Sequence, residues 1–178
     1  FALLSKKIQN LNGKTIGIIG KGSIGLKVAK LSKAFGMKVS FLSAQNLKKS
    51  NLNKFLKEID ILTIHCPLNK NTENLISLKE LKLMKQDSII INTARGGIIN
   101  ERDLVHALNK KIISAAGIDV TTMEPPKKTH PYYRIINSPN FIWTPHTAWA
   151  SDETLKNALD QLIENINAYY LGKPKNLV

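Results

Sequence analysis

The sequence predicts an α/β fold in which helices cover both faces of a doubly wound parallel sheet. Short runs rich in Ile, Val and Thr alternate with stretches of helical spacing, which is the pattern of consecutive βαβ units. A glycine-rich segment, residues 20–25, directly follows the first such run and opens a helical stretch. At 178 residues the chain has about the usual size of one domain. We therefore expect a single globular unit without an internal boundary.

The predicted strands are short because buried parallel strands appear as brief, nearly continuous runs of branched apolar residues. Right-handed crossovers through the intervening helices would place them all in one parallel sheet. The strands are expected at residues 15–19, 38–43, 61–65, 88–93, 115–119 and 141–144. The helices are expected at residues 24–35, 53–59, 78–84 and 102–110, the last capped by Asn100.

The last two segments have different patterns. Residues 121–140 contain four prolines and are predicted to form an ordered loop between two strands. Residues 152–171 repeat apolar side chains at steps of three and one. That spacing predicts an amphipathic helix with one buried face.

Composition and charge exclude several classes of protein. No apolar run approaches the length that spans a bilayer, no secretory signal is visible, and a single cysteine cannot form an intramolecular disulfide. A cytoplasmic protein without a membrane partner is therefore expected. The net charge of +13 would suit a nucleic-acid binder, but only three of the 26 basic residues are arginines and the lysines are scattered. A solvated lysine surface is the preferred interpretation, without a nucleic-acid partner.

The segment Gly20-Lys21-Gly22-Ser23-Ile24-Gly25 has the spacing of a dinucleotide-binding turn. Its three glycines would provide a tight turn, close approach of the backbone to a pyrophosphate, and close packing of helix on strand. Ser23 and Ile24 would open the helix whose N-terminus faces the phosphates. A glycine-rich turn alone is weak evidence, but the strand before it and the helix after it are the context that a Rossmann fold requires.

The second predicted strand ends without the acidic residue that binds the adenosine ribose of NAD in many such folds. Counting 18 residues beyond Gly25 leads to Ser43, whose hydroxyl can bond either a ribose hydroxyl or a 2′-phosphate. Lys48 and Lys49 are near enough in sequence to assist with a phosphate, or they are simply solvated. The choice between NAD and NADP stays open.

Three polar residues follow successive predicted strands: Arg95, Glu124 and His146. The carboxyl ends of parallel strands meet at the ligand-binding edge of a doubly wound sheet. There Arg95 could bind a carboxylate, and a carboxylate neighbour would favour the protonated form of His146 as a general acid. Each residue alone could equally be an ordinary loop residue. Their shared position on the edge that carries the glycine turn is what favours function.

The chain resembles the D-isomer-specific 2-hydroxyacid dehydrogenases, specifically their nucleotide-binding domain. The resemblance is carried in order by residues 11–20, 64–68, 92–97, 117–120 with 124–125, and 144–149. It implies that NAD(P)H exchanges a hydride with a 2-oxo acid or D-2-hydroxy acid, and that Arg95 binds the substrate while His146 acts as acid/base beside Glu124. The cofactor-binding residues it implies are Gly20, Gly22, Ser23, Ile24, Gly25, Ser43, Cys66, Pro67, Thr93, Ala94, Asp119 and His146.

Within that family, Trp149 after the histidine is similar to the glycerate dehydrogenase and hydroxypyruvate reductase branch. The family also implies a homodimer, and a second, N-terminal substrate-binding domain that this sequence lacks. We therefore expect cofactor binding with poor turnover from these 178 residues alone. The alternative is a non-enzymatic NAD(H) sensor resembling the C-terminal binding protein corepressors.

The remaining histidines and the single cysteine are not expected to form a site. His65 and Cys66 would point to opposite faces of a strand, which argues against a Cys-His dyad and against a metal site. His106 lies in a predicted helix and His130 in the proline-rich loop, and both are expected to be exposed to solvent.

Overall fold

The computed structural model describes residues 9–43 and 47–177. Contacts divide the chain into two compact units, one ending at Pro145 and the other beginning at His146. The two units are described separately below.

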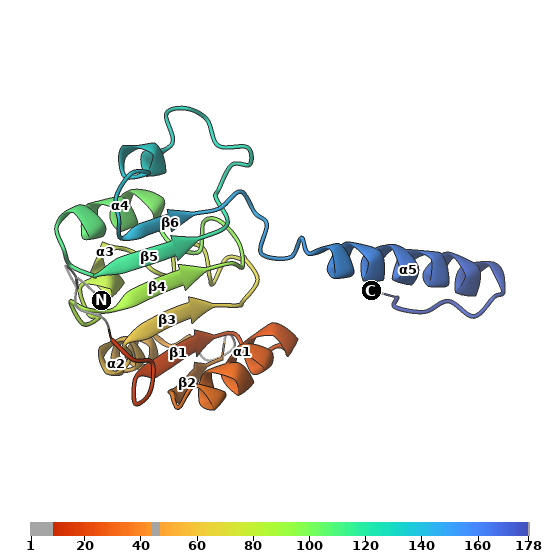
Figure 1. The fold of residues 1–178 in the computed structure, drawn as a ribbon, viewed down its shortest axis with the longest axis horizontal. Coiled ribbons are helices and arrows are strands. Elements are labelled where there is room, and N and C mark those ends of the chain that lie inside the picture. The colour runs from red at the N-terminus through yellow and green to blue at the C-terminus, as the bar shows by residue number, and fades with distance from the viewer. Residues whose placement is uncertain (1–8, 44–46, 178) are drawn as a thin grey trace, which may run out of the picture. The chain divides into compact units, whose positions relative to one another are not determined.

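The first unit contains a six-stranded, fully parallel sheet in the order β2-β1-β3-β4-β5-β6 (Figure 1). The chain moves from β1 to its outer neighbour β2, then returns past β1 to β3 and continues outward in the opposite direction. This reversal makes the sheet doubly wound, as predicted. The strands are β1 (Thr15–Ile19), β2 (Lys38–Leu42), β3 (Ile61–Ile64), β4 (Ile89–Asn92), β5 (Ala115–Ile118) and β6 (Phe141–Trp143).

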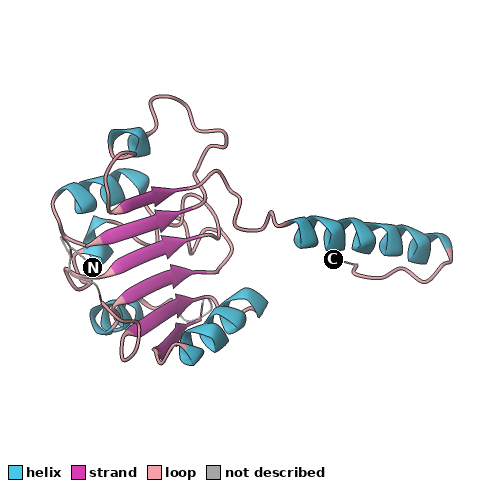
Figure 2. Cartoon of the chain, in the orientation of Figure 1, coloured by secondary structure: helices cyan, strands magenta, loops and turns pink. Residues whose placement is uncertain are grey.

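Helices cover the two faces of the sheet unequally (Figure 2). Helix α1 (Ser23–Ala34) packs through Ala29 on Ile16 and Ile18 of β1. The opposite face carries the larger core, where fully buried side chains such as Leu56, Leu62 and Ile90 meet. The helices on that face are α2 (Lys49–Glu58), α3 (Leu78–Leu81) and α4 (Glu101–Asn109).

The predicted elements are confirmed, with differences of a few residues at their ends. Five of the six strands end one residue earlier than predicted, because the polar or bulky residue after each strand already belongs to the loop at the ligand-binding edge. Helix α2 begins at Lys49 rather than at residue 53. The cap of α4 is confirmed, since the side chain of Asn100 accepts a hydrogen bond from the Asp103 amide. The proline-rich loop contains one 3₁₀ turn, η2 (Pro131–Arg134).

The second unit consists of a short segment from His146, helix α5 (Asp152–Tyr170) and a short tail. The tail folds back on the helix, where Lys173 N–H donates to the Ala168 carbonyl and Asn176 bonds Asn165. Ala168 is the buried residue of α5 among those that the structure describes. The prediction of a buried apolar face is therefore wrong here, because this unit has no second element large enough to cover that face. The exposed apolar residues are Leu155, Leu159, Leu162, Ile163, Ile166 and Tyr169.

Among the described residues, none of the helices combines the length and the apolar character needed to cross a lipid bilayer.

Asp60 joins three strands at the amino-terminal edge of the sheet. Its carboxylate accepts hydrogen bonds from the Thr15 amide and from the Lys85 ammonium, both at 2.7 Å, and its carbonyl accepts from the Ile89 amide. Burial opposes ionisation of Asp60, but the Lys85 and Thr15 hydrogen bonds outweigh it and hold the pKa of this carboxyl below its usual value.

We predict that Asp60→Asn lowers the free energy of unfolding by about 1–2 kcal/mol at pH 7, because two donors lose their charged acceptor. A lowered pKa stabilises the fold above the unfolded-state pKa, and that stabilisation is lost as pH falls through the folded-state pKa. The difference between wild type and variant should therefore shrink below about pH 4. Urea denaturation of wild type and Asp60→Asn at pH 7 and below about pH 4 measures this difference. Asp87→Asn, which removes only a long and exposed contact to Lys14, is the matched control.

Candidate functional site

A pocket of about 450 Å³ opens where the strand order reverses. It is lined by residues that follow β1, β3 and β4, at their carboxyl ends. Doubly wound sheets bind their ligands in this crevice. Six residues singled out from the sequence line it, together with His65 and Leu68: Ile24, Cys66, Pro67, Thr93, Ala94 and Arg95.

Two glycines of the 20–25 turn are required by the packing of the protein itself. Gly20 has φ +106°, and a Cβ there would lie 2.5 Å from the His65 carbonyl oxygen. At Gly25 a Cβ would lie 2.1 Å from the carbonyl oxygen of Gly20. Only glycine allows the turn, the segment after β3 and helix α1 to approach this closely.

Gly22 differs, because a Cβ there would meet no protein atom within 4 Å. Packing therefore does not require this glycine, and the space beside it suits close approach by a ligand. Helix α1 starts at the next residue without a side-chain cap and without an acidic residue in its first turn. Uncapped amides at a helix N-terminus attract anions. The turn thus fits the pyrophosphate of a dinucleotide.

The loop after β4 holds Arg95 at the exposed rim of the pocket. The buried side chain of Asn92 shapes this loop, since it donates to the Arg95 carbonyl at 2.9 Å and accepts from the Ala94 amide at 3.0 Å. The Arg95 guanidinium donates to the Ala94 carbonyl at 2.7 Å and stays exposed to solvent. An exposed guanidinium beside a pocket can bind a carboxylate with two hydrogen bonds.

The loop after β5 carries Glu124 and lies against the Arg95 loop. The Thr121 amide donates to the Glu124 carboxylate at 2.9 Å, and the Thr121 hydroxyl bonds the Met123 carbonyl. A Cβ at Gly96 would lie 2.0 Å from the Thr121 carbonyl carbon. The structure therefore brings the loops of Arg95 and Glu124 together, with Gly96 as the contact point.

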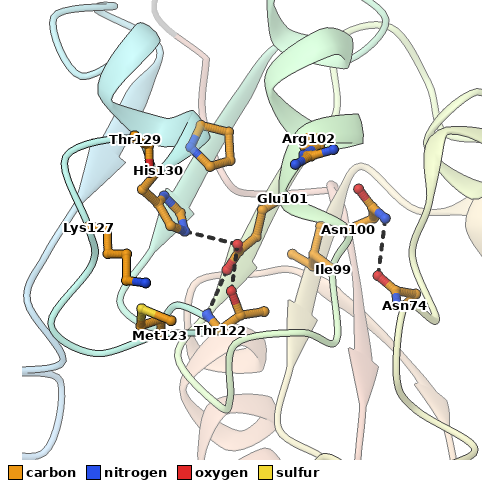
Figure 3. Close-up of a pocket in the computed structure, with 11 residues that line it drawn as sticks. Asn74, Ile99, Asn100, Glu101, Arg102, Thr122, Met123, Lys127, Thr129 and His130 are labelled. Carbon is orange, nitrogen blue, oxygen red and sulfur yellow. Dashed lines mark hydrogen bonds and ion pairs between the residues drawn. The ribbon is translucent and has the colours of Figure 1, made fainter.

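Glu101, at the start of α4, binds Thr122 of the loop that carries Glu124 (Figure 3). Its carboxylate accepts from the Thr122 amide at 2.7 Å, from the Thr122 hydroxyl at 2.9 Å and from His130 Nε2 at 2.9 Å. The side chains of His130 and Glu101 are only 6% and 11% exposed. The prediction that His130 is exposed is therefore wrong, because this ring is buried against a carboxylate. His106 is exposed, as predicted.

The His130 ring also touches the segment that leads to His146. It stacks on Trp143 of β6 at 5.6 Å between ring centroids. Its Nδ1 accepts a hydrogen bond from the Tyr132 amide, so the proton lies on the Nε2 that faces Glu101. Burial, reinforced by the Glu101 charge, raises the pKa of the Tyr132 phenol. No sequence motif indicated the pairing of Glu101 with His130, because the two residues lie 29 positions apart in the chain.

The other predicted site residues are distributed over both units. Asp119 is buried after β5, where it accepts from the Thr144 hydroxyl. Ser43 directly follows β2. His146 is the first residue of the second unit and has a left-handed backbone with φ +55°, which is uncommon outside glycine.

His65, which is half-buried, and Cys66, which is buried, lie just beyond β3 and line the pocket. Burial lowers the pKa of His65 and raises the pKa of the Cys66 thiol, so the uncharged forms of both are favoured. The His65 ring bonds the Thr63 hydroxyl at 3.0 Å. Over the described ranges, no three His, Cys, Asp or Glu residues gather closely enough to hold a metal ion.

Comparisons with known proteins show the family of this chain. Residues 3–148 match the model of the D-isomer specific 2-hydroxyacid dehydrogenase NAD binding domain. The chain is 41% identical, over its whole length, to 57% of the glycerate dehydrogenase of Methylorubrum extorquens. It therefore spans a little over half the length of that curated relative.

Solved structures show the same likeness. The structure of D-lactate dehydrogenase with NAD+ from Lactobacillus jensenii superposes with a TM-score of 0.87 and 31% identity. The match covers the whole of this chain and 59% of that dehydrogenase chain. The structure of an acyclic imino acid reductase in complex with NADPH and D-Arg superposes with a TM-score of 0.81 and 37% identity. The match covers 96% of this chain and 55% of the reductase chain. By sequence and by fold, this chain belongs to the D-isomer-specific 2-hydroxyacid dehydrogenases and comprises their NAD-binding domain.

Proposed function

We propose that the protein transfers a hydride between NAD(P)H and a 2-oxo acid, and catalyses the reverse oxidation of a D-2-hydroxy acid. The observation that carries this proposal is the pocket at the reversal of strand order, which combines the glycine turn with an exposed guanidinium. A dinucleotide on the turn and a carboxylate on Arg95 would meet there. The relatives named above are dehydrogenases and a reductase, which favours an enzyme over an NAD(H)-sensing corepressor.

In this proposal the protein supplies binding, orientation and one proton. Gly20, Gly22 and the amides that open α1 would hold the pyrophosphate, and Asp119 would contact the nicotinamide side of the cofactor. The bound cofactor supplies the hydride. Arg95 binds the substrate carboxylate and carbonyl, which orients the 2-oxo carbon for attack. Protonated His146, with Glu124 as its partner carboxylate, gives its proton to the substrate oxygen as the alcohol forms.

Several finer statements belong to the same proposal. Glycerate and hydroxypyruvate are the proposed substrate pair, supported by the glycerate dehydrogenase likeness and by Trp149. A homodimer and a cytoplasmic location are proposed from the family and from the single cysteine. The residues assigned to the cofactor are those that the family resemblance implies, with Ser23, Ile24, Cys66, Pro67, Thr93 and Ala94 beside the glycines.

Cofactor binding is tested with Gly22→Asp, which places a carboxylate where the pyrophosphate is expected. We predict at least a tenfold loss of NADH and NADPH affinity, measured by fluorescence titration. The free energy of unfolding should stay within about 0.5 kcal/mol of wild type, because the new side chain meets open space. Asn109→Asp adds the same charge at the exposed end of α4 and should leave binding unchanged. Wild-type affinity in Gly22→Asp would remove the turn from the proposed site.

Turnover is tested by following NAD(P)H absorbance with hydroxypyruvate and with glyoxylate in the active protein. His146→Gln is expected to lower kcat by roughly 10²–10⁴-fold, because the proton donor is lost. Arg95→Gln should chiefly raise KM, because it removes the charge that binds the carboxylate. Arg134→Gln, an exposed arginine at the end of η2, is the control for loss of a guanidinium. Unchanged kinetics in both test variants would contradict the proposal.

The anchoring of the Glu124 loop is tested at Glu101. Glu101→Ala leaves three hydrogen-bond donors without their acceptor and is predicted to lower the free energy of unfolding by about 2–4 kcal/mol. Glu101→Gln retains one acceptor oxygen, so its free energy of unfolding should fall by roughly half as much. Glu73→Gln, at an exposed position, should change stability by less than about 0.5 kcal/mol. Equal stability of Glu101→Ala and wild type in urea denaturation would refute the anchoring role.

A further inference from the structure

The positive charge of the chain is concentrated in one part of the sequence. Residues 1–57 contain twelve lysines and neither aspartate nor glutamate, whereas the other 121 residues contain 14 basic and 13 acidic residues. Nearly all of the net charge of +13 therefore lies in the part of the chain that forms β1, α1, β2 and most of α2. In the sheet, β1 and β2 form one side of the reversal point.

This is the side on which a doubly wound sheet holds the adenosine half of a dinucleotide. The ribose lies at the carboxyl end of the second strand, beside the glycine turn. In this structure the end of β2 is hydrogen-bonded to the glycine turn, because the Gly20 amide donates to the Leu42 carbonyl at 3.1 Å. Ser43 is the residue after Leu42. Ser43 therefore occupies the position from which a side chain can reach the 2′ position of that ribose.

The chemistry at this position distinguishes the two cofactors. A carboxylate after β2 binds the 2′-hydroxyl of NAD and repels the 2′-phosphate of NADP. Ser43 carries no charge, and the residues from 11 to 57 include no acidic residue that could take over this role. A serine hydroxyl can donate a hydrogen bond to a phosphate oxygen. The main barrier to a 2′-phosphate is therefore missing.

A positive charge stands close by. The ammonium of Lys21, in the glycine turn, lies 5.7 Å from the centroid of the Phe41 ring in β2. A cation–π contact of this kind holds the charge near the end of β2, only two residues before Ser43. Lys21 is exposed to solvent, so its charge is accessible to a ligand.

We infer that the adenosine subsite favours a 2′-phosphorylated dinucleotide, so that NADP(H) is preferred over NAD(H), with Lys21 and Ser43 as the residues that determine this preference. The inference rests on the proposed nucleotide-binding function and specifies its cofactor. Lys21 supplies the opposite charge for the phosphate, and Ser43 supplies a neutral hydrogen-bond partner in place of a carboxylate.

The test is a comparison of NADPH and NADH affinities for the 178-residue chain by calorimetry at low ionic strength. We expect NADPH to bind about tenfold more tightly or better, and added salt to reduce this advantage because it screens the extra phosphate charge. Adenosine 2′-monophosphate should compete with NADPH more strongly than adenosine 5′-monophosphate does. NADH affinity equal to or above that of NADPH would overturn the inference while leaving the proposed function intact. Binding of neither dinucleotide would overturn both.

Two variants assign the preference to individual residues. Ser43→Asp should reverse it, and retained NADH binding shows that this variant is folded. Lys21→Gln should weaken NADPH binding about tenfold and NADH binding less than twofold. Lys38→Gln is the matched control, because it removes the same charge from the opposite end of β2. Equal losses of NADPH affinity in Lys21→Gln and Lys38→Gln would show a diffuse surface effect and refute the role of Lys21.

Discussion

The close approach of two backbone segments at Gly20 is the constraint on which the candidate site depends. The turn after β1 and the segment after β3 meet where the strand order reverses, and a Cβ at Gly20 would lie 2.5 Å from the His65 carbonyl oxygen. A larger residue would separate β1 from β3 at their carboxyl ends, and the pocket between their loops would change shape. The positive φ of Gly20 turns the chain from the strand into α1 at the same point. One residue thus fixes both the turn and the pocket wall.

The loops on the other side of the pocket depend on a chain of polar contacts. Asn92 shapes the loop of Arg95, Gly96 packs on the Thr121 backbone, and the Thr121 amide bonds Glu124. Glu101 then ties the adjacent Thr122 to α4 and to His130. Because loops have few apolar contacts of their own, hydrogen bonds of this kind are what can hold their reactive side chains in place. The Glu101 carboxylate thus fixes the loop that carries Glu124 to helix α4.

The sequence predicted local features better than distant contacts. The strands, the cap at Asn100 and the glycine turn were predictable because each depends on residues close together in the chain. The pairing of Glu101 with His130 was not, because a histidine in a proline-rich segment has no local pattern that indicates burial. The amphipathic period of α5 was recognised, but a period indicates which face is apolar and not whether anything covers it.

The charges of the chain are divided in the way that a two-part ligand requires. Lysines dominate the sequence that forms β1 and β2, where the phosphates of a dinucleotide would lie. In contrast, the described residues that line the pocket include one cation, Arg95, beside a histidine whose pKa is lowered by burial. In the proposed function, this single guanidinium among largely neutral side chains would pair with the carboxylate of the substrate. In the proposed function, the phosphates of the cofactor and the carboxylate of the substrate would therefore meet different cations of the chain.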